Sequence, residues 1–214
     1  MIVANNTPQI SPNFWKTAVD ELREKDKILG KLISNDESEV FFSQGDAFTT
    51  LVRAIVGQQI SVKAAASVWH KLTLQLTEIS PYAVSSADIA LLKTCGLSAR
   101  KVSYIQDLST HFLRGCYDEA QWQNMDDESL IKLLIQLRGI GRWTAEMFLI
   151  FYMLRPDVLP LDDIGLQRAV SIHYNQNQTV NKQLIKKIAQ RWQPWRSVAT
   201  WYLWRSLDPI PVNY

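Results

Sequence analysis

The chain has 214 residues, of which 47% are hydrophobic, so it can bury a core large enough for one compact domain or two small lobes. Its 23 basic and 21 acidic side chains give a formal net charge of +2, which by itself indicates no particular partner. The 2 cysteines are too few for a disulfide framework or a cluster held by four thiolates, and the 3 histidines lack metal-ligand spacing. We therefore expect ordinary thiols and no catalytic metal held by side chains.

The N-terminal segment and the apolar runs argue against a secreted or membrane-spanning chain. Residues 1–11 lack the basic start and the long apolar segment of a secretory signal, and we expect them to form a flexible arm. The longest apolar run, Met147 to Leu154, is far shorter than the roughly 20 residues that a membrane span needs. These features favour a cytoplasmic protein.

Helical periodicity dominates the chain, and alternating strand patterns are scarce. Breaks that carry Gly, Pro, Asn or Ser separate the segments, for example at Ser80-Pro81 and Gly96. We predict an all-α protein in which residues 12–214 form one domain of two interleaved helical lobes. In chain order, the predicted helices run from Phe14 to Leu32, Phe48 to Val56, Ala64 to Leu76, Lys101 to Leu113, Glu128 to Leu137, Trp143 to Leu154, Leu166 to His173 and Asn181 to Trp192.

The charged residues are segregated along the chain. Ile164 to Leu207 contains no Asp or Glu, and Ile89 to Gln106 is also free of acidic residues, whereas Asp20 to Asp46 is predominantly acidic. This asymmetry indicates a face turned toward a polyanion, although a run of charge is more often a solvated helix face. The cations of the first segment are Arg168, Lys182, Lys186, Lys187, Arg191, Arg196 and Arg205.

Two glycines one residue apart join two predicted helices in the segment Leu137 to Ala145, LRGIGRWTA. Gly139 and Gly141 permit a positive φ and leave no side chain in the way, so the backbone can approach another group closely. The N–H groups that open the next helix can then face an anion such as a DNA phosphate, with the helix dipole adding to the attraction. A hairpin whose glycines merely cap a helix explains the same pattern equally well.

Two carboxylates end the loop that follows this hairpin. Asp162 and Asp163 stand just before a predicted helix, in the segment PLDDIGLQR. Paired aspartates at a helix start are ordinarily N-caps, which accounts for at least one of them. The other is then available for chemistry.

The pattern L-x-G-I-G-x-x-T-A, followed by a Pro/Asp loop with an Asp five residues before an Arg, resembles the helix-hairpin-helix DNA glycosylase superfamily. Within it, the chain is most similar to the alkylation-repair branch, 3-methyladenine DNA glycosylase II. The resemblance implies two helical lobes, a helix-hairpin-helix motif at residues 128–154 and a DNA-binding cleft between the lobes. Further segments that carry it are Leu51 to Ala65, Cys95 to Lys101 and Arg191 to Arg205.

The resemblance implies an enzyme that flips an alkylated purine out of double-stranded DNA and hydrolyses its N-glycosidic bond, leaving an abasic site. The family's spacing places the catalytic aspartate at Asp163, five residues before Arg168, with Asp162 as a supporting neighbour. Cleavage develops positive charge on the sugar, and an ionised carboxylate stabilises that charge. Relatives with a lyase step carry a lysine where this chain has Trp143, so we expect a monofunctional enzyme.

The resemblance also implies which residues contact DNA and the flipped base. Gln59 is the expected wedge that fills the gap left by the base, and a solvent-facing loop glutamine is the structural alternative. Electron-poor bases bind well against aromatic faces, although most single tryptophans belong to a core. The expected DNA-contact residues are Gly139, Ile140, Gly141, Thr144, Gln59 and Ser61, and the expected base-pocket residues are Trp143, Trp204, Met147 and Ile164.

We expect a monomer with double-stranded DNA containing damaged bases as its partner, no membrane and no organic cofactor. If the source is bacterial, we expect the protein to be associated with the nucleoid. A structural cation at the hairpin is compatible with the sequence, because main-chain carbonyls can bridge to a phosphate through a bound cation. A non-catalytic helix-hairpin-helix DNA-binding module is the alternative function, and it predicts no need for Asp163. A helical scaffold for protein partners ranks last, since it leaves the glycine pair and the acid-free basic segment unexplained.

Overall fold

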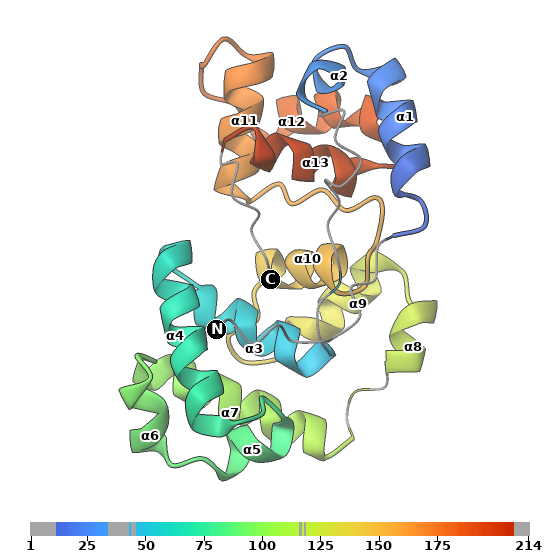
Figure 1. Ribbon diagram of the computed structural model, residues 1–214. Coiled ribbons are helices and arrows are strands. Elements are labelled where there is room, and N and C mark those ends of the chain that lie inside the picture. Colours follow the sequence, from blue (N-terminus) through green and yellow to red (C-terminus); the bar gives the residue numbers. More distant parts are fainter. Residues whose placement is uncertain (1–11, 34–42, 44–45, 116, 118, 208–214) are drawn as a thin grey trace. The chain divides into compact units, whose positions relative to one another are not determined.

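The computed structural model describes residues 12–33, 43, 46–115, 117 and 119–207, and over these residues every regular element is a helix (Figure 1). The all-α expectation is therefore confirmed. The expected N-terminal arm, residues 1–11, lies outside the described residues.

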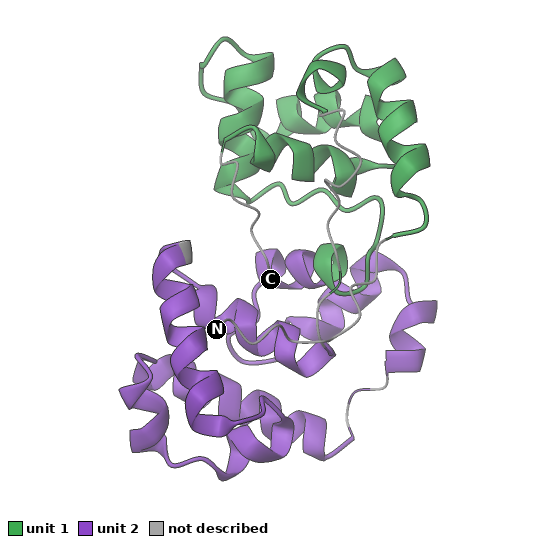
Figure 2. Ribbon diagram, viewed as in Figure 1, with its two compact units in different colours: residues 1–44, 149–213 green, residues 45–148, 214 purple. Residues whose placement is uncertain are grey.

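The chain divides into two compact units, of which one is discontinuous in sequence (Figure 2). Unit 1 comprises residues 1–44 and 149–213, and unit 2 comprises residues 45–148 together with residue 214. The boundary falls inside one helix, α10 (Arg142–Phe151). The division agrees with the expected pair of helical lobes, and each unit has its own apolar core.

Unit 2 is built around α7, which packs against α3, α5 and α6. The core between α3 and α7 is formed by Leu51, Ile55, Ile105 and Leu108, whose side chains are completely or almost completely buried. Most of the helices begin at a Ser or Asp whose side chain accepts a main-chain N–H of the first turn, which satisfies donors that the helix itself leaves unpaired. The helices of this unit are α3 (Ala47–Gly57), α4 (Val62–Leu76), α5 (Pro81–Ser86), α6 (Ile89–Thr94), α7 (Ala99–Leu113), α8 (Glu119–Asn124) and α9 (Asp127–Leu134).

Unit 1 is built around α13 (Arg196–Arg205), which packs against α1, α2 and α11. Residues 197–203 of this helix are all buried, so it lacks a polar face. The other helices of the unit are α1 (Trp15–Lys25), α2 (Leu29–Leu32), α11 (Ile164–Tyr174), α12 (Lys182–Ala189) and the short 3-10 helix η1 (Gln190–Trp192).

A buried aspartate joins the N-terminal and C-terminal parts of unit 1. Asp26 is 2% exposed and accepts hydrogen bonds from the main-chain N–H groups of Ile28 (2.8 Å) and Leu29 (3.2 Å) at the start of α2. It also accepts from the Tyr174 hydroxyl (2.8 Å) and from Trp192 Nε1–H (2.9 Å). Burial, together with the Asp26 charge, raises the pKa of Tyr174, which keeps its hydroxyl a donor. Asp26 thus ties α2 to α11 and η1.

The predicted helix from Phe14 to Leu32 is wrong as a single element. It breaks at Asp26, whose backbone is extended (φ −138°, ψ 106°) and whose side chain caps the next helix. Periodicity also missed α5, α6, α8 and α13. A helix that is buried all round, such as α13, shows no amphipathic pattern. The pair Ser80-Pro81, which we expected to interrupt structure, instead starts α5, because Ser80 is its N-cap and Pro81 occupies the first turn.

Among the described residues, no helix is long and apolar enough to cross a membrane, and no group of three or more His, Cys, Asp or Glu could hold a metal ion. Cys95 is a buried free thiol, and burial raises its pKa. Cys116 lies outside the described residues.

Candidate active site

Asp163 is the N-cap of α11, and only 9% of it is exposed. Its Oδ1 accepts the main-chain N–H of Leu166 at 2.6 Å and the indole Nε1–H of Trp204 at 2.7 Å. The carboxylate therefore caps one helix while a side chain from another helix orients it. Asp162 is exposed and forms an ion pair with Lys182 of α12. The expectation that at least one of the two aspartates caps the helix is confirmed, and the capping residue is Asp163, the one matched to catalysis.

Gly165 leaves the space that the pair of Asp163 and Trp204 needs. A Cβ at Gly165 would lie 3.0 Å from Trp204 Cδ1 and 3.1 Å from Asp163 Oδ1, closer than ordinary contacts. The Trp204 ring also stacks on Phe151, with 5.9 Å between ring centroids and 18° between planes. Trp204, which we matched to the base pocket, thus touches the carboxylate directly. Ile164 lies next to Asp163 in sequence and is 79% exposed.

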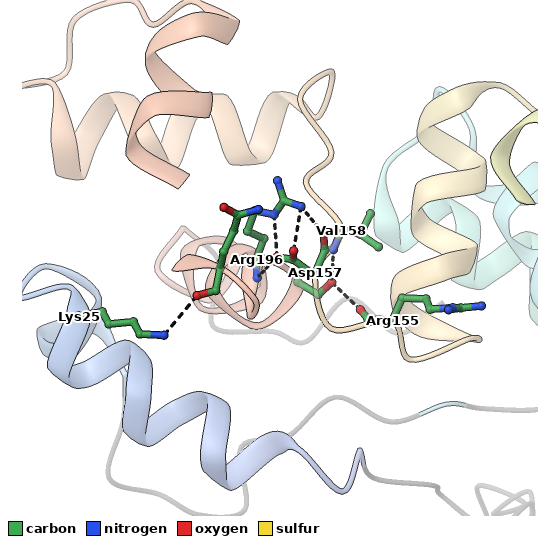
Figure 3. Close-up of polar contacts among 7 residues, drawn as sticks. Lys25, Arg155, Asp157, Val158 and Arg196 are labelled. Carbon is green, nitrogen blue, oxygen red and sulfur yellow. Dashed lines mark hydrogen bonds and ion pairs between the residues drawn. The ribbon is translucent and has the colours of Figure 1, made fainter. Parts of the chain in front are cut away.

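The loop that leads to Asp163 is fastened to the start of α13 (Figure 3). Arg196 Nε donates to Asp157 Oδ1 at 2.7 Å, and its Nη2 donates to Asp157 Oδ2 and to the Asp157 carbonyl, both at 2.9 Å. Ser197 Oγ donates to the carbonyl of Arg155 at 2.6 Å and accepts the N–H of Val158 at 3.0 Å. Because α13 also carries Trp204, one helix positions both the loop and the indole that holds Asp163.

The hairpin between α9 and α10 has two glycines in different roles. Gly139 has a φ of +87°, and a Cβ there would lie 2.2 Å from Cδ2 of Tyr104, so a larger residue would collide with that ring. Gly141 does not have a positive φ, and a Cβ there would meet nothing within 4 Å. Gly139 is thus required by the packing of the hairpin on Tyr104. Gly141 is exposed, and the space beside it is open.

A side chain that sequence reasoning missed joins the hairpin to the loop between α3 and α4. Gln58 Nε2 donates to the Gly139 carbonyl at 2.8 Å and lies 3.3 Å from Thr144 Oγ1. Lys101 Nζ holds the same loop by donating to the carbonyls of Val56 (2.7 Å) and Gln58 (2.8 Å). Both residues lie in segments that resemble the family, but the resemblance gave them no role.

The loop held in this way presents Gln59, which is exposed and has a φ of +57°. The left-handed region is unfavourable for a residue with a Cβ, so this conformation depends on the surrounding hydrogen bonds. Gln59 lines a pocket together with Gly139, Ile140 and Gly141. The structure therefore brings the expected wedge and the hairpin together. Ser61 is exposed at the start of α4, where it accepts the N–H of Ala64 at 3.2 Å.

The remaining expected site residues differ in their exposure to solvent. Thr144 is only 3% exposed, and its Oγ1 lies 3.3 Å from Gln58 Nε2, so a contact between Thr144 and DNA stays a prediction. Trp143 is partly exposed in the first turn of α10, whereas Met147 is 1% exposed and lies in the interior. That Met147 lines a base pocket stays a prediction.

The helical fold, the glycine hairpin and the aspartate at the start of α11 define a class of proteins that repair DNA. A model of the HhH-GPD superfamily of base excision DNA repair proteins matches residues 52–194, which include the hairpin and Asp163. The match covers more than half of the chain, and the chain belongs to this family.

Individual members of the family resemble the chain over most of its length. It is 29% identical to DNA-3-methyladenine glycosylase 1 of Schizosaccharomyces pombe over 189 residues, which cover 86% of this chain and 83% of that protein. It is 31% identical to DNA-3-methyladenine glycosylase 2 of Escherichia coli over 175 residues, but it spans only 57% of that relative. Among solved structures, the S. pombe 3-methyladenine DNA glycosylase Mag1 in complex with abasic DNA matches with a TM-score of 0.77 and 28% identity, over 89% of this chain and 96% of that one.

Proposed function

We propose that this chain is a monofunctional DNA glycosylase that removes alkylated purines, of the 3-methyladenine and 7-methylguanine type, from double-stranded DNA. The observation that carries the proposal is Asp163, whose buried carboxylate is held by Leu166 and Trp204 in a chain of the HhH-GPD family. The names of the S. pombe and E. coli relatives support the class of substrate.

The proposed reaction breaks the bond between C1′ of the sugar and the purine nitrogen, and the base leaves with the electron pair of that bond. Water adds to C1′ and releases one proton to the solvent. The base must first be flipped out of the duplex, because the bond is otherwise inaccessible. As the bond breaks, positive charge develops on the sugar, and the Asp163 carboxylate stabilises it. An N-alkylated purine is already cationic and leaves as a neutral base, so one carboxylate suffices without a general acid. The product is an abasic site.

The proposed DNA contacts belong to the hairpin and to the loop before α4. The N–H groups at the start of α10 bind a backbone phosphate, and Gln59 fills the gap left by the flipped base. The reaction needs no organic cofactor, because water is its only co-substrate. A cation held by hairpin carbonyls would add to the attraction for phosphate, since hard cations prefer oxygen ligands. We place the enzyme in the cytoplasm, at the nucleoid in a bacterium.

The variant Asp163→Asn tests the catalytic assignment. We expect release of 3-methyladenine and 7-methylguanine from alkylated duplex DNA to fall by about 100-fold or more, because a neutral amide cannot stabilise the positive charge of the transition state. Single-turnover base release at saturating enzyme measures this step, and the Kd for undamaged duplex should stay near that of the wild type. Undiminished release would refute the assignment and would favour the alternative of a DNA-binding module.

Trp143 stands where a lyase would need an amine, so we predict that the protein has no lyase activity. Incubating the wild-type protein with alkylated duplex DNA and borohydride should trap no covalent protein–DNA adduct, and the abasic product should remain uncleaved until alkali is added. Gel electrophoresis under denaturing conditions detects both outcomes. A trapped adduct would show that another amine forms a Schiff base with the sugar.

A further inference from the structure

A pocket of about 310 Å³ lies within unit 2, and part of its lining has no assigned role. One wall is the hairpin, residues 139–141, and a second is formed by Gln58 and Gln59. The third wall is the beginning of α7, with Ser98, Arg100 and Lys101. The residues that line the pocket include two cations and no acidic residue.

The two cations occupy positions that are unfavourable within the protein itself. Arg100 and Lys101 are in the first turn of α7, a 15-residue helix that has no acidic residue there. The positive end of the helix dipole lies at this terminus and repels a cation, which is why acidic residues are favoured at such positions. A cation at this helix start is therefore unfavourable, unless an internal acceptor or a bound anion lies beside it.

Neither cation is paired with a carboxylate among the described residues. Lys101 Nζ contacts only the carbonyl oxygens of Val56 and Gln58, and burial lowers its pKa. Arg100 is exposed and forms no ion pair with any of the described residues. Arg142 offers a contrast at the start of α10, because it forms ion pairs with Glu128 and Glu146. Arg142 is thus neutralised internally and Lys101 is used to hold a loop, whereas Arg100 is available to a ligand.

We propose that this pocket binds a second phosphate of the DNA backbone, distinct from the one at the start of α10, with Arg100 as its charged contact. The proposal rests on the proposed function, because it requires DNA as the ligand. A guanidinium binds two phosphate oxygens at once, and the main-chain N–H groups that open α7 add further donors. Since Gln59 lines the same pocket, the bound phosphate lies near the gap that the wedge fills.

The test compares Arg100→Gln with Arg114→Gln, which makes the same change of charge at the other end of α7. Binding of undamaged duplex is measured by fluorescence anisotropy from 50 to 300 mM salt. We expect Arg100→Gln to weaken binding by about 3- to 10-fold and to reduce the slope of log K against log salt by about 1, since one phosphate contact is lost. Arg114→Gln should change neither quantity.

Protein stability separates this effect from misfolding. Removing a cation from a helix N-terminus should leave the Tm of Arg100→Gln unchanged or slightly raised, so weaker binding cannot be attributed to unfolding. Duplexes with a single neutral methylphosphonate linkage then locate the phosphate. One linkage should weaken binding by the wild type and have no effect on Arg100→Gln.

Two results overturn the second phosphate site. One is an equal Kd and salt slope for the two arginine variants, and the other is a methylphosphonate effect that is the same in wild type and Arg100→Gln at every linkage. If the wild type still releases alkylated bases, the proposed function survives that failure. If the wild type releases no base but Arg100→Gln alone loses salt-dependent binding, the phosphate site stands and the proposed enzymatic function fails.

Discussion

Asp163 both caps α11 and is the proposed catalytic carboxylate, and the geometry of the cap makes the two roles compatible. The main-chain N–H of Leu166 and the indole N–H of Trp204 both donate to the same oxygen, Oδ1. These two bonds fix the plane of the carboxylate before any substrate binds. A carboxylate that is already oriented needs no reorganisation as charge develops on the sugar, which is the condition for strong electrostatic stabilisation.

Trp204→Phe tests whether the indole N–H positions Asp163. We expect single-turnover base release to fall by about 10- to 100-fold, because a hydrogen bond to a charged group contributes about 1.5 to 3 kcal/mol. The ring that stacks on Phe151 is retained, so affinity for undamaged duplex should hardly change. Trp195→Phe is the matched control, since Trp195 Nε1 also donates to a carboxylate, that of Glu21, at 2.9 Å and away from Asp163.

Gly165→Ala provides a second variant that disturbs the same pair by another route. Its Cβ would lie 3.0 Å from Trp204 Cδ1, so the indole must shift to make room. Base release should fall in this variant too, with the whole pH–rate profile lowered. Equal activity of Trp204→Phe and Trp195→Phe would contradict a positioning role for Trp204.

At the scale of elements, the loop before Asp163 and the hairpin are each held in place by contacts with other helices and loops. The first turn of α13 fastens the loop before Asp163 through Arg196 and Ser197, and its last turn carries Trp204. The hairpin is fastened by Gln58 and by the packing of Gly139 on Tyr104. In both cases, the residues that make the contacts are far in sequence from the residues they position.

The two hairpin glycines should respond differently to alanine. Gly139→Ala places a Cβ against the Tyr104 ring at a φ of +87°, so we expect a loss of about 2 kcal/mol or more in the free energy of unfolding and weaker binding of every duplex. Gly141→Ala should change stability by only about 0.5 kcal/mol, because its Cβ meets open space. That same Cβ should obstruct a phosphate and weaken binding.

Urea denaturation and the Kd for undamaged duplex measure the two effects separately. Unchanged binding by Gly141→Ala would mean that DNA does not approach the hairpin at this point. An unchanged free energy of unfolding for Gly139→Ala would mean that the Tyr104 ring moves aside at little energetic cost.

On the scale of the whole molecule, unit 1 depends on both ends of the chain. It combines residues 1–44 with residues 149–213, and Asp26 provides a buried polar connection between the two segments. The proposed catalytic residue Asp163 belongs to this unit. Its geometry therefore depends on an N-terminal segment that is remote from it in sequence.

Asp26→Ala should strongly destabilise unit 1. It would leave the Tyr174 hydroxyl and the Trp192 indole N–H without their acceptor in the interior and would remove the cap of α2, so we expect a loss of about 3 to 5 kcal/mol. Asp88→Ala is the control, because Asp88 also caps a short helix but is exposed, and its loss should be about 1 kcal/mol. Equal effects in urea denaturation would show that Asp26 acts only as a cap.

The amino-acid sequence by itself determined the features that depend on near neighbours. Helical periodicity predicted the all-α class and most of the longer helices, and the glycine pair located the hairpin. The spacing of Asp163 and Arg168 indicated the family, and a monofunctional reaction, expected from Trp143 in place of a lysine, stays a prediction. Such patterns can be recognised in the sequence because a helix, a cap or a turn is set by residues only a few positions apart.

Only the tertiary structure decided which side chains support these groups. The bond from Trp204 to Asp163 joins residues 41 positions apart, and the bond from Gln58 to Gly139 spans 81 positions. The buried helix α13 and the break at Asp26 also escaped prediction, because burial on all sides removes the amphipathic pattern and the break depends on partners in α11 and η1. Contacts of this kind follow from packing, which no local pattern encodes.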